Sequence, residues 1–242
     1  MLELKNISYS VDDENGRVDI LKDVSVSFDG RFIAITGPNG SGKSTLAKIV
    51  AGIIKPTSGK ILLDGEDITE LGIDERARLG ISYAFQQPVK FKGITVRDII
   101  SMASGKKLPL SAVCEYLSQV GLCAIDYVDR EINDSLSGGE LKRIEIATIM
   151  ARGTKVSIFD EPEAGIDLWS FQNLIQVFNK LREKTDGMVI IISHQERILN
   201  IADKVLLLSN GQISDYGTGE SIMPGIASGV TAVCIKAAEQ EV

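Results

Sequence analysis

The segment Gly-Pro-Asn-Gly-Ser-Gly-Lys-Ser at residues 37–44 constrains the fold of this chain more than any other. It matches the pattern GxxxxGK[ST] and lies between an apolar run, Arg31–Thr36, and a stretch of helical character, Ser44–Ala51. The glycines let the backbone curl so that successive N–H groups face one anion, and the helix start adds the positive end of its dipole. The pattern therefore predicts a strand, a phosphate-binding loop and a helix, in that order.

The residue types in this loop suit a nucleoside triphosphate and a magnesium ion. Lys43 would bring a positive charge to the β- and γ-phosphates, and the Ser44 hydroxyl is placed to bind Mg²⁺. The residues expected to contact the nucleotide are Gly37, Pro38, Asn39, Gly40, Ser41, Gly42, Lys43, Ser44 and Thr45.

A second element of a phosphate site follows much later in the chain. The apolar run Val156–Phe159 ends in Asp160 and Glu161. Asp160 would hold Mg²⁺ through water, and Glu161 could polarise the attacking water. Taken alone, the segment could equally be a strand followed by an acidic turn. Together with the loop at residues 37–44, it predicts a site for triphosphate hydrolysis.

Strand-like and helical segments alternate along most of the chain. Leu2–Tyr9 and Val18–Phe28 predict an antiparallel hairpin, with a turn at Asp12–Gly16. Further strands are expected at Lys60–Leu63, Ile81–Phe85, Val156–Phe159, Met188–Ile192 and Val205–Leu208. The pattern predicts an α/β fold with a mostly parallel core sheet, an N-terminal antiparallel β subdomain and an inserted α-helical lobe at about residues 90–150. We expect residues 1–242 to form a single domain.

Charge and cysteine content narrow the classes of partner. The net charge is −7, from 26 Lys and Arg against 33 Asp and Glu, which argues against a nucleic-acid partner. The chain begins with a strand pattern rather than a signal peptide and has no apolar run of about 18 residues, so we expect a cytoplasmic protein without direct membrane insertion. Cys114, Cys123 and Cys234 are expected to be reduced thiols, with a metal or cluster site as the alternative.

Several further segments resemble the motifs of ABC ATPases, in the order that family has. Leu136-Ser137-Gly138-Gly139-Glu140 is similar to the ABC signature motif, upstream of Asp160. Gln86, after the expected strand Ile81–Phe85, resembles the Q-loop glutamine. Glu163–Asp167 resembles the D-loop, and His194 resembles the switch histidine. The resemblance covers about Leu2 to Gly219.

The resemblance implies that the nucleotide is ATP and that the chain is an ATPase. Glu161, His194 and Gln86 would be catalytic, and Ser44, Gln86 and Asp160 would hold Mg²⁺. Ser137, Gly138, Gly139 and Glu140 would contact the ATP held by a second protomer, so an ATP-dependent homodimer is expected. Where many ABC domains stack the adenine on an aromatic residue, this sequence has Val11. Stacking by Tyr9 is the alternative.

A narrower resemblance is to SufC, the ATPase of iron–sulfur cluster assembly. It rests on six segments, Ile68–Leu71, Asp74–Ile81, Ala84–Val89, Gly138–Arg143, Ala164–Asp167 and Ser193–Leu199. SufC sequences more often have Thr and Tyr where this chain has Ser193 and Gln195, and Glu161–Glu163 also differs from the commoner form. These departures indicate a divergent or minimal-system branch. The resemblance implies a SufB-like scaffold partner that carries the cluster ligands and contacts Gln86–Gly93 and the helical lobe.

Two other functions remain open from the sequence. The chain could be the nucleotide-binding subunit of a membrane importer or exporter, which would have the same motifs and a different coupling surface. It could also be a scaffold that binds ATP and hydrolyses little of it. The sequence predicts no role for the tail at residues 224–242.

Overall fold

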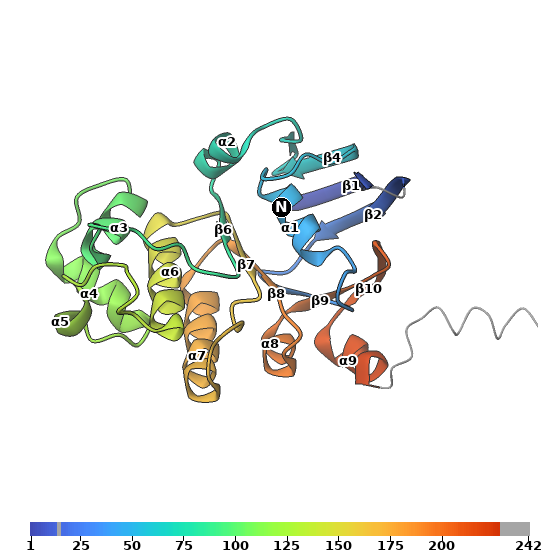
Figure 1. The fold of residues 1–242 in the computed structure, drawn as a ribbon. Coiled ribbons are helices and arrows are strands. Elements are labelled where there is room, and N and C mark those ends of the chain that lie inside the picture. Colours follow the sequence, from blue (N-terminus) through green and yellow to red (C-terminus); the bar gives the residue numbers. More distant parts are fainter. Residues whose placement is uncertain (14–15, 228–242) are drawn as a thin grey trace, which may run out of the picture. The chain divides into compact units, whose positions relative to one another are not determined.

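The computed structural model describes residues 1–13 and 16–227 and consists of two compact units (Figure 1). The first unit comprises Met1–Arg78 and the chain from Ile190 onward, and the second comprises Leu79–Val189. The predicted turn at Asp12–Gly16 lies partly outside the described residues, and the tail beyond residue 227 lies wholly outside them.

The first unit contains an antiparallel sheet and a mostly parallel group of strands. Its strands are β1 (Leu2–Asp13), β2 (Gly16–Phe28), β3 (Phe32–Thr36), β4 (Ser58–Leu63), β5 (Glu66–Asp67), β9 (Lys204–Ser209) and β10 (Gln212–Gly217). Its helices are α1 (Lys43–Val50), α2 (Ile73–Arg78), α8 (Glu196–Ile201) and α9 (Gly219–Ala227). Strand β8 (Met188–Ile192) begins in the second unit and ends in the first.

The antiparallel sheet has the strand order β2-β1-β4-β5 and confirms the predicted N-terminal hairpin. Leu2 and Leu4 on β1 are buried, while Lys5 is exposed. This alternation gives the first half of the strand one buried face.

The parallel strands of the first unit carry the loop at residues 37–42. β3 pairs parallel with β9, and β9 pairs antiparallel with β10. Every residue of β3 is buried, as expected for a strand covered on both faces. A Cβ at Gly37, directly after β3, would lie 1.9 Å from the carbonyl oxygen of Leu208 on β9. Only glycine fits where this strand passes into the loop.

A buried arginine connects α2 to the end of α1. Arg76 is 1 % exposed. Its Nε donates to the carbonyl oxygen of Leu71 at 3.0 Å, and one terminal nitrogen donates to Ile49 at 2.6 Å and Val50 at 2.9 Å. The other donates to the carbonyl oxygen of Thr69 at 2.8 Å. Because the last carbonyls of a helix have no intrahelical donor, the guanidinium closes the helix that begins at the loop.

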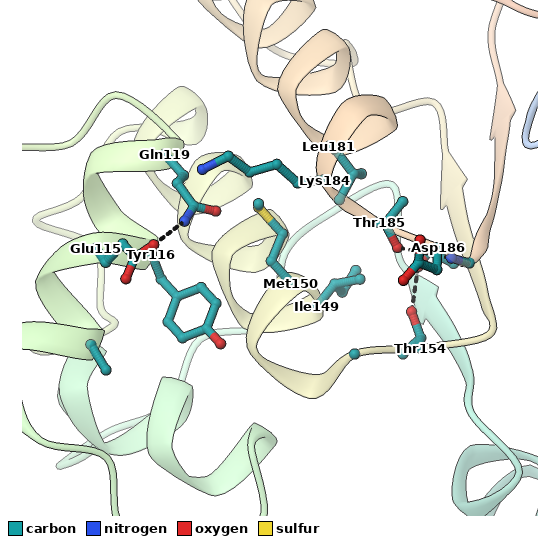
Figure 2. Close-up of a pocket in the computed structure, with 14 residues that line it drawn as sticks. Glu115, Tyr116, Gln119, Ile149, Met150, Thr154, Leu181, Lys184, Thr185 and Asp186 are labelled. Atoms are coloured by element: carbon teal, nitrogen blue, oxygen red, sulfur yellow. Dashed lines mark hydrogen bonds between the residues drawn. The ribbon is translucent and has the colours of Figure 1, made fainter.

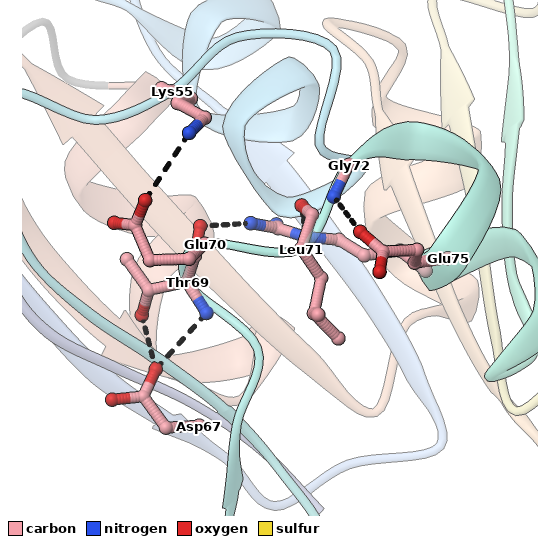
Figure 3. A network of polar contacts seen from close by, with 8 residues as sticks. Lys55, Asp67, Thr69, Glu70, Leu71, Gly72 and Glu75 are labelled. Carbon is pink, nitrogen blue, oxygen red and sulfur yellow. Dashed lines mark hydrogen bonds and ion pairs between the residues drawn. The ribbon is translucent and has the colours of Figure 1, made fainter.

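The segment around this arginine is fixed by further polar contacts (Figure 3). Thr69 donates from its N–H and its hydroxyl to Asp67, and the N–H of Gly72 donates to Glu75 at 2.9 Å. The Thr69 contacts lower the pKa of Asp67 to about 2. The segment that supplies carbonyls to Arg76 is therefore held in place by its own side chains.

The second unit contains two parallel strands and the predicted helical lobe. Its elements are β6 (Ile81–Ala84), α3 (Val96–Ala103), α4 (Leu110–Gln119), α5 (Ala124–Tyr127), α6 (Gly138–Arg152), β7 (Val156–Asp160) and α7 (Leu168–Lys184). β6 and β7 pair parallel. Both α3 and α4 pack on α6, burying Val96 and Ile100 from α3 and Val113 and Leu117 from α4. Each such side chain contributes about 1.5–3 kcal/mol through removal from water.

The α/β architecture agrees with the expectation from the sequence, while the C-terminal helix does not follow from it. α9 continues through Pro224, where the sequence shows no clear periodicity. No helix in the described ranges 1–13 and 16–227 has the length and hydrophobicity needed to cross a bilayer. The prediction that residues 1–242 form one domain stays a prediction.

Candidate active site

The loop at residues 37–42 has the backbone geometry of an anion cradle. Gly37, Gly40 and Gly42 have φ angles of 143°, 77° and 100°, which favour glycine. The Lys43 side chain is 5 % exposed, and its Nζ donates to the carbonyl oxygens of Gly37 and Pro38, both at 2.9 Å. The predicted contact residues therefore form one continuous loop and the first turn of α1.

Two observations show that this loop fits a triphosphate. The Ser41 hydroxyl is buried and has no hydrogen-bond partner among the described residues. A Cβ at Gly40 would meet nothing within 4 Å, so the space at the loop is open there. With a lysine ammonium in the same loop and a helix starting at Lys43, these features suit an anion with several oxygens. Ser44, in the first turn, is half-buried and could hold Mg²⁺.

His194 belongs to the same unit as the loop. It is exposed and lies two residues beyond the end of β8. The N–H of the preceding residue, Ser193, donates to the carbonyl oxygen of Ile35 on β3 at 3.1 Å. The end of β8 is therefore beside the end of β3, which places His194 and the loop on neighbouring strand ends.

The second unit holds the predicted acidic pair at the end of β7. Asp160 is the last residue of β7 and is 6 % exposed. Its Oδ2 accepts a hydrogen bond of 2.6 Å from the hydroxyl of Tyr83 on β6. Glu161 follows, and its Oε2 accepts a hydrogen bond of 2.7 Å from Nε2 of Gln86. The structure thus brings Gln86 and Glu161 together, as their predicted shared site requires.

Tyr83 stays a hydrogen-bond donor at neutral pH. Burial raises the pKa of its phenol well above the usual value, and the bond to the Asp160 carboxylate raises the pKa further. Sequence reasoning did not select Tyr83, because its contact depends on β6 and β7 being neighbours.

A buried ion pair on α6 holds the residue that precedes Gln86. Nζ of Lys142 donates to the carbonyl oxygen of Phe85 at 2.5 Å and lies 3.6 Å from the Glu145 carboxylate. The N–H of Phe85 also hydrogen-bonds to Glu145. Burial raises the pKa of Glu145 to about 7, with Lys142 opposing the rise, and burial lowers the pKa of Lys142. Both main-chain polar groups of Phe85 are therefore fixed to the helix that starts with the signature-like motif.

The signature-like motif forms the start of α6. Ser137 caps the helix by accepting from the N–H of Glu140 at 3.3 Å, and its own N–H donates to the Glu140 carboxylate at 2.6 Å. Tyr127 donates from its hydroxyl to the same carboxylate. A Cβ at Gly139 would lie 3.0 Å from Cβ of Ser170, so this glycine allows α6 and α7 to approach. Glu140 is thus occupied in shaping the helix start, with Ser137 and Gly138 exposed beside it.

The D-loop-like segment leads into α7. Asp167 caps this helix by accepting from the N–H groups of Trp169 and Ser170, both at 3.0 Å. Leu168 and Trp169 are 65 % and 82 % exposed. Large apolar side chains are therefore displayed next to the helix start that carries Gly139.

The predicted residues fall into two groups. Residues 37–45 and His194 lie in the first unit, and Gln86, Asp160, Glu161 and Ser137–Glu140 lie in the second. Sequence reasoning missed Tyr83, Lys142 and Glu145. The charges of Lys142 and Glu145, three residues apart on an expected helix, were the available signal for a pair.

The second unit also contains a cavity (Figure 2). It has a volume of about 550 Å³ and is lined by α4, by the C-terminal ends of α6 and α7, and by the segment that follows each of them. Since Ser137 and Gly153 are at opposite ends of α6, a helix of 15 residues, they are separated by roughly 20 Å. The cavity is not part of the candidate active site.

The described residues include two of the three cysteines. Cys114 and Cys123 are free thiols, and Cys234 lies outside the described residues. In those residues, no group of three or more His, Cys, Asp or Glu side chains is arranged to hold a metal ion.

Comparison with known proteins identifies the family. A family model described as ABC transporter matches residues 21–164, which include the loop, the signature-like motif and the Asp160–Glu161 pair. The chain belongs to the ABC transporter family. An ABC member of this kind binds ATP with Mg²⁺ and hydrolyses it to ADP and phosphate, so this chain is an ATPase.

Sequence relatives and a solved structure agree with this assignment. An uncharacterized ABC transporter ATP-binding protein of Methanocaldococcus jannaschii is 38 % identical over 216 residues, which cover 86 % of each chain. The "probable ATP-dependent transporter ycf16" of Pyropia yezoensis is 36 % identical over 234 residues, covering 90 % of this chain and 91 % of that protein. A dimeric ATP-binding cassette in a post-hydrolysis state, bound to ADP and Pi, matches with a TM-score of 0.78 at 24 % identity, covering 90 % of this chain and 98 % of that one. The structural likeness confirms the ABC ATPase fold.

Proposed function

We propose that this ABC ATPase is a SufC-like subunit that drives iron–sulfur cluster assembly on a SufB-like scaffold protein. The six segments that resemble SufC support the narrower assignment within the family. In this proposal the protein works in the cytoplasm, inserts into no membrane and binds no nucleic acid. The scaffold, rather than this chain, carries the cluster ligands.

One observation carries the proposal of a protein partner. The segment after β6 displays apolar side chains, with Phe85 40 %, Val89 50 % and Phe91 37 % exposed. A run of exposed apolar residues on a soluble protein is typical of a docking surface. Phe85, the first residue of this segment, is fixed to α6 through Lys142 and Glu145. A partner bound here would therefore act on the helix that begins with the signature-like motif.

The proposed catalytic roles belong to residues of both units. In the proposed site Lys43 and the loop glycines bind the phosphates, while Ser44, Gln86 and Asp160 hold Mg²⁺. The ion, when bound, neutralises charge on the β- and γ-phosphates. Glu161 polarises the attacking water.

His194 and Gln86 complete the proposed catalytic set. His194 is exposed on the strand end beside the loop, where its imidazole can meet the γ-phosphate. Gln86 follows the anchored residue Phe85, so its position depends on that anchor. We propose that this arrangement links the state of the nucleotide to the docking segment, which is the exposed stretch Phe85–Phe91 after β6.

A homodimer would complete the site. Ser137, Gly138, Gly139 and Glu140 form the capped start of α6, and a helix start favours an anion. We propose that they contact the ATP held by a second protomer. Closure of two protomers around two ATP molecules excludes water, and hydrolysis then allows the dimer to open.

The sole tryptophan offers a test of this dimer. Trp169 is 82 % exposed and follows the D-loop-like segment. A protomer that docks on the start of α6 would also cover the start of α7, because Gly139 packs against Ser170. In a Glu161→Gln variant we expect Mg²⁺ and ATP to double the mass measured by light scattering from 26.2 kDa. Acrylamide quenching of Trp169 should fall several-fold at the same time.

ADP in place of ATP is the matched control, because it lacks the γ-phosphate that a second protomer would contact. The mass should then stay monomeric, and the quenching should stay high. An unchanged mass with ATP would contradict the homodimer. A doubled mass with unchanged quenching would place Trp169 outside the interface.

Partner capture tests the SufC-like assignment. We expect the full chain to bind a soluble protein that holds an iron–sulfur cluster after reconstitution. Val89→Asp should reduce the captured amount at least about 10-fold, because it puts a charge into the apolar docking segment. Ile73→Asp is the control, since Ile73 is also 50 % exposed but starts α2, which belongs neither to the segment after β6 nor to the helical lobe. Exclusive recovery of an integral membrane permease would refute the assignment.

A transporter subunit is the second candidate. The M. jannaschii relative is named an ABC transporter ATP-binding protein, and the P. yezoensis relative is named a probable ATP-dependent transporter. The same exposed segment could dock on a membrane subunit. Capture of a multi-span membrane protein, lost in Val89→Asp and kept in Ile73→Asp, would favour this candidate.

A further inference from the structure

Tyr83 and Asp160 form a contact between adjacent parallel strands. The register pairs Tyr83 with Ile158, so Asp160, two residues further along β7, presents its side chain on the same face. The Tyr83 hydroxyl spans this offset and donates to Oδ2 of Asp160 at 2.6 Å. Both residues belong to the second unit, and the contact is fixed by regular strand pairing rather than by a loop.

This bond is important because the Asp160 carboxylate is buried. A buried carboxylate without a donor is costly, and one without a fixed partner can also rotate about its last bond. A carboxylate that holds a metal works best when its own hydrogen bonds fix its direction, and loss of such bonds typically weakens metal binding about 10- to 100-fold.

We infer that Tyr83 is a positioning residue that sets the orientation of the Asp160 carboxylate toward Mg²⁺. The inference rests on the role proposed above for Asp160. It assigns Tyr83 no contact with ATP or with the reacting atoms. Its effect is confined to the direction in which Asp160 presents its oxygens.

The Phe85 ring joins this pair to the docking segment. The rings of Tyr83 and Phe85 meet edge to face, with centroids 4.9 Å apart and planes at 74°. Phe85 is 40 % exposed, so its ring contacts both solvent and the phenol. Phe85 therefore contacts the phenol that binds Asp160 from the start of the exposed segment after β6.

The test separates metal binding from nucleotide binding and from turnover. In the Glu161→Gln background, the Kd of ATP is measured with saturating Mg²⁺ and with excess EDTA. The Kd in EDTA divided by the Kd in Mg²⁺ reports how much Mg²⁺ strengthens ATP binding. Tyr83→Phe should lower this ratio about 10-fold, while the Kd in EDTA changes less than about twofold. Circular dichroism checks that the variant is folded.

Ser82→Ala is the matched control on the same strand. The Ser82 hydroxyl is buried and has no hydrogen-bond partner among the described residues, so its removal should leave the ratio unchanged. An equal fall in Ser82→Ala and Tyr83→Phe would overturn the inference, because the effect would then come from the strand.

Asp160→Asn distinguishes failure of this inference from failure of the proposed function. If Asp160→Asn lowers the ratio and Tyr83→Phe does not, only the role of Tyr83 is wrong. If Asp160→Asn leaves the ratio unchanged, the proposed metal role of Asp160 is wrong as well.

Discussion

Replacing Glu161 with glutamine should lower the rate of ATP hydrolysis by about two to four orders of magnitude, because it removes the carboxylate that would accept the proton of the attacking water. The side chain keeps its size, and the nearby Gln86 still has a carbonyl or amide partner. ATP binding should therefore change little. Phosphate release measures the first quantity, and equilibrium binding of a fluorescent ATP analogue measures the second.

Lys43→Ala supplies the contrasting variant. Lys43 is buried in the loop and bonded to its carbonyl oxygens, so its loss should weaken nucleotide binding itself. If Glu161→Gln hydrolyses ATP as fast as the unchanged protein, the proposed role of Glu161 is wrong. Unchanged binding by Lys43→Ala would contradict the assignment of the loop.

Replacing Arg76 with methionine should reduce the free energy of unfolding by at least about 3 kcal/mol. Arg76 donates to four main-chain carbonyls from a position that is 1 % exposed. Methionine fills a similar volume and donates no hydrogen bond. The Ile49 carbonyl keeps the N–H of Gly52 as a donor at 3.1 Å, and each buried acceptor left without a donor costs about 1–3 kcal/mol. Two of these carbonyls end α1, so the helix beneath the phosphate-binding loop should also fray. Urea denaturation at 25 °C measures the loss.

Arg78→Ala is the control for charge and position, since it lies on the same short helix. The Arg78 side chain is 76 % exposed and pairs with Asp74 at 3.2 Å. An exposed pair contributes no more than about 1 kcal/mol, so the urea midpoint should move little. Equal midpoints for Arg76→Met and the unchanged chain would mean that the buried carbonyls find other donors.

The features that were predicted from the sequence are those encoded by contiguous residues. The loop at residues 37–44 specifies a strand, a turn and a helix within one short segment, and the structure has β3, the loop and α1 in that order. The Asp160–Glu161 pair is equally local. Alternation of strands and helices predicted the α/β class, because periods of 2 and 3.6 leave different patterns.

Contacts that depend on which strands are neighbours could not be predicted. Tyr83 and Asp160 are 77 positions apart and meet because β6 pairs with β7. Lys142 and Phe85 are 57 positions apart and meet because α6 packs beside the end of β6. In the sequence, Arg76 is one of several charged residues on a short helix, and only the fold shows that it is buried. α9 was missed because small residues and Pro224 carry little periodic signal.

The backbone conformation at Glu161 favours substitutions that would remove its carboxylate. Its φ angle is 45°, in the left-handed region, where a residue with a Cβ is strained by about 1–3 kcal/mol and glycine is comfortable. A substitution that relaxes this turn, such as Glu161→Gly, would stabilise the fold and remove the carboxylate. With Glu161 in its proposed catalytic role, screens for thermostable variants are therefore expected to enrich inactive sequences at this position, and an active variant has to retain the strained backbone.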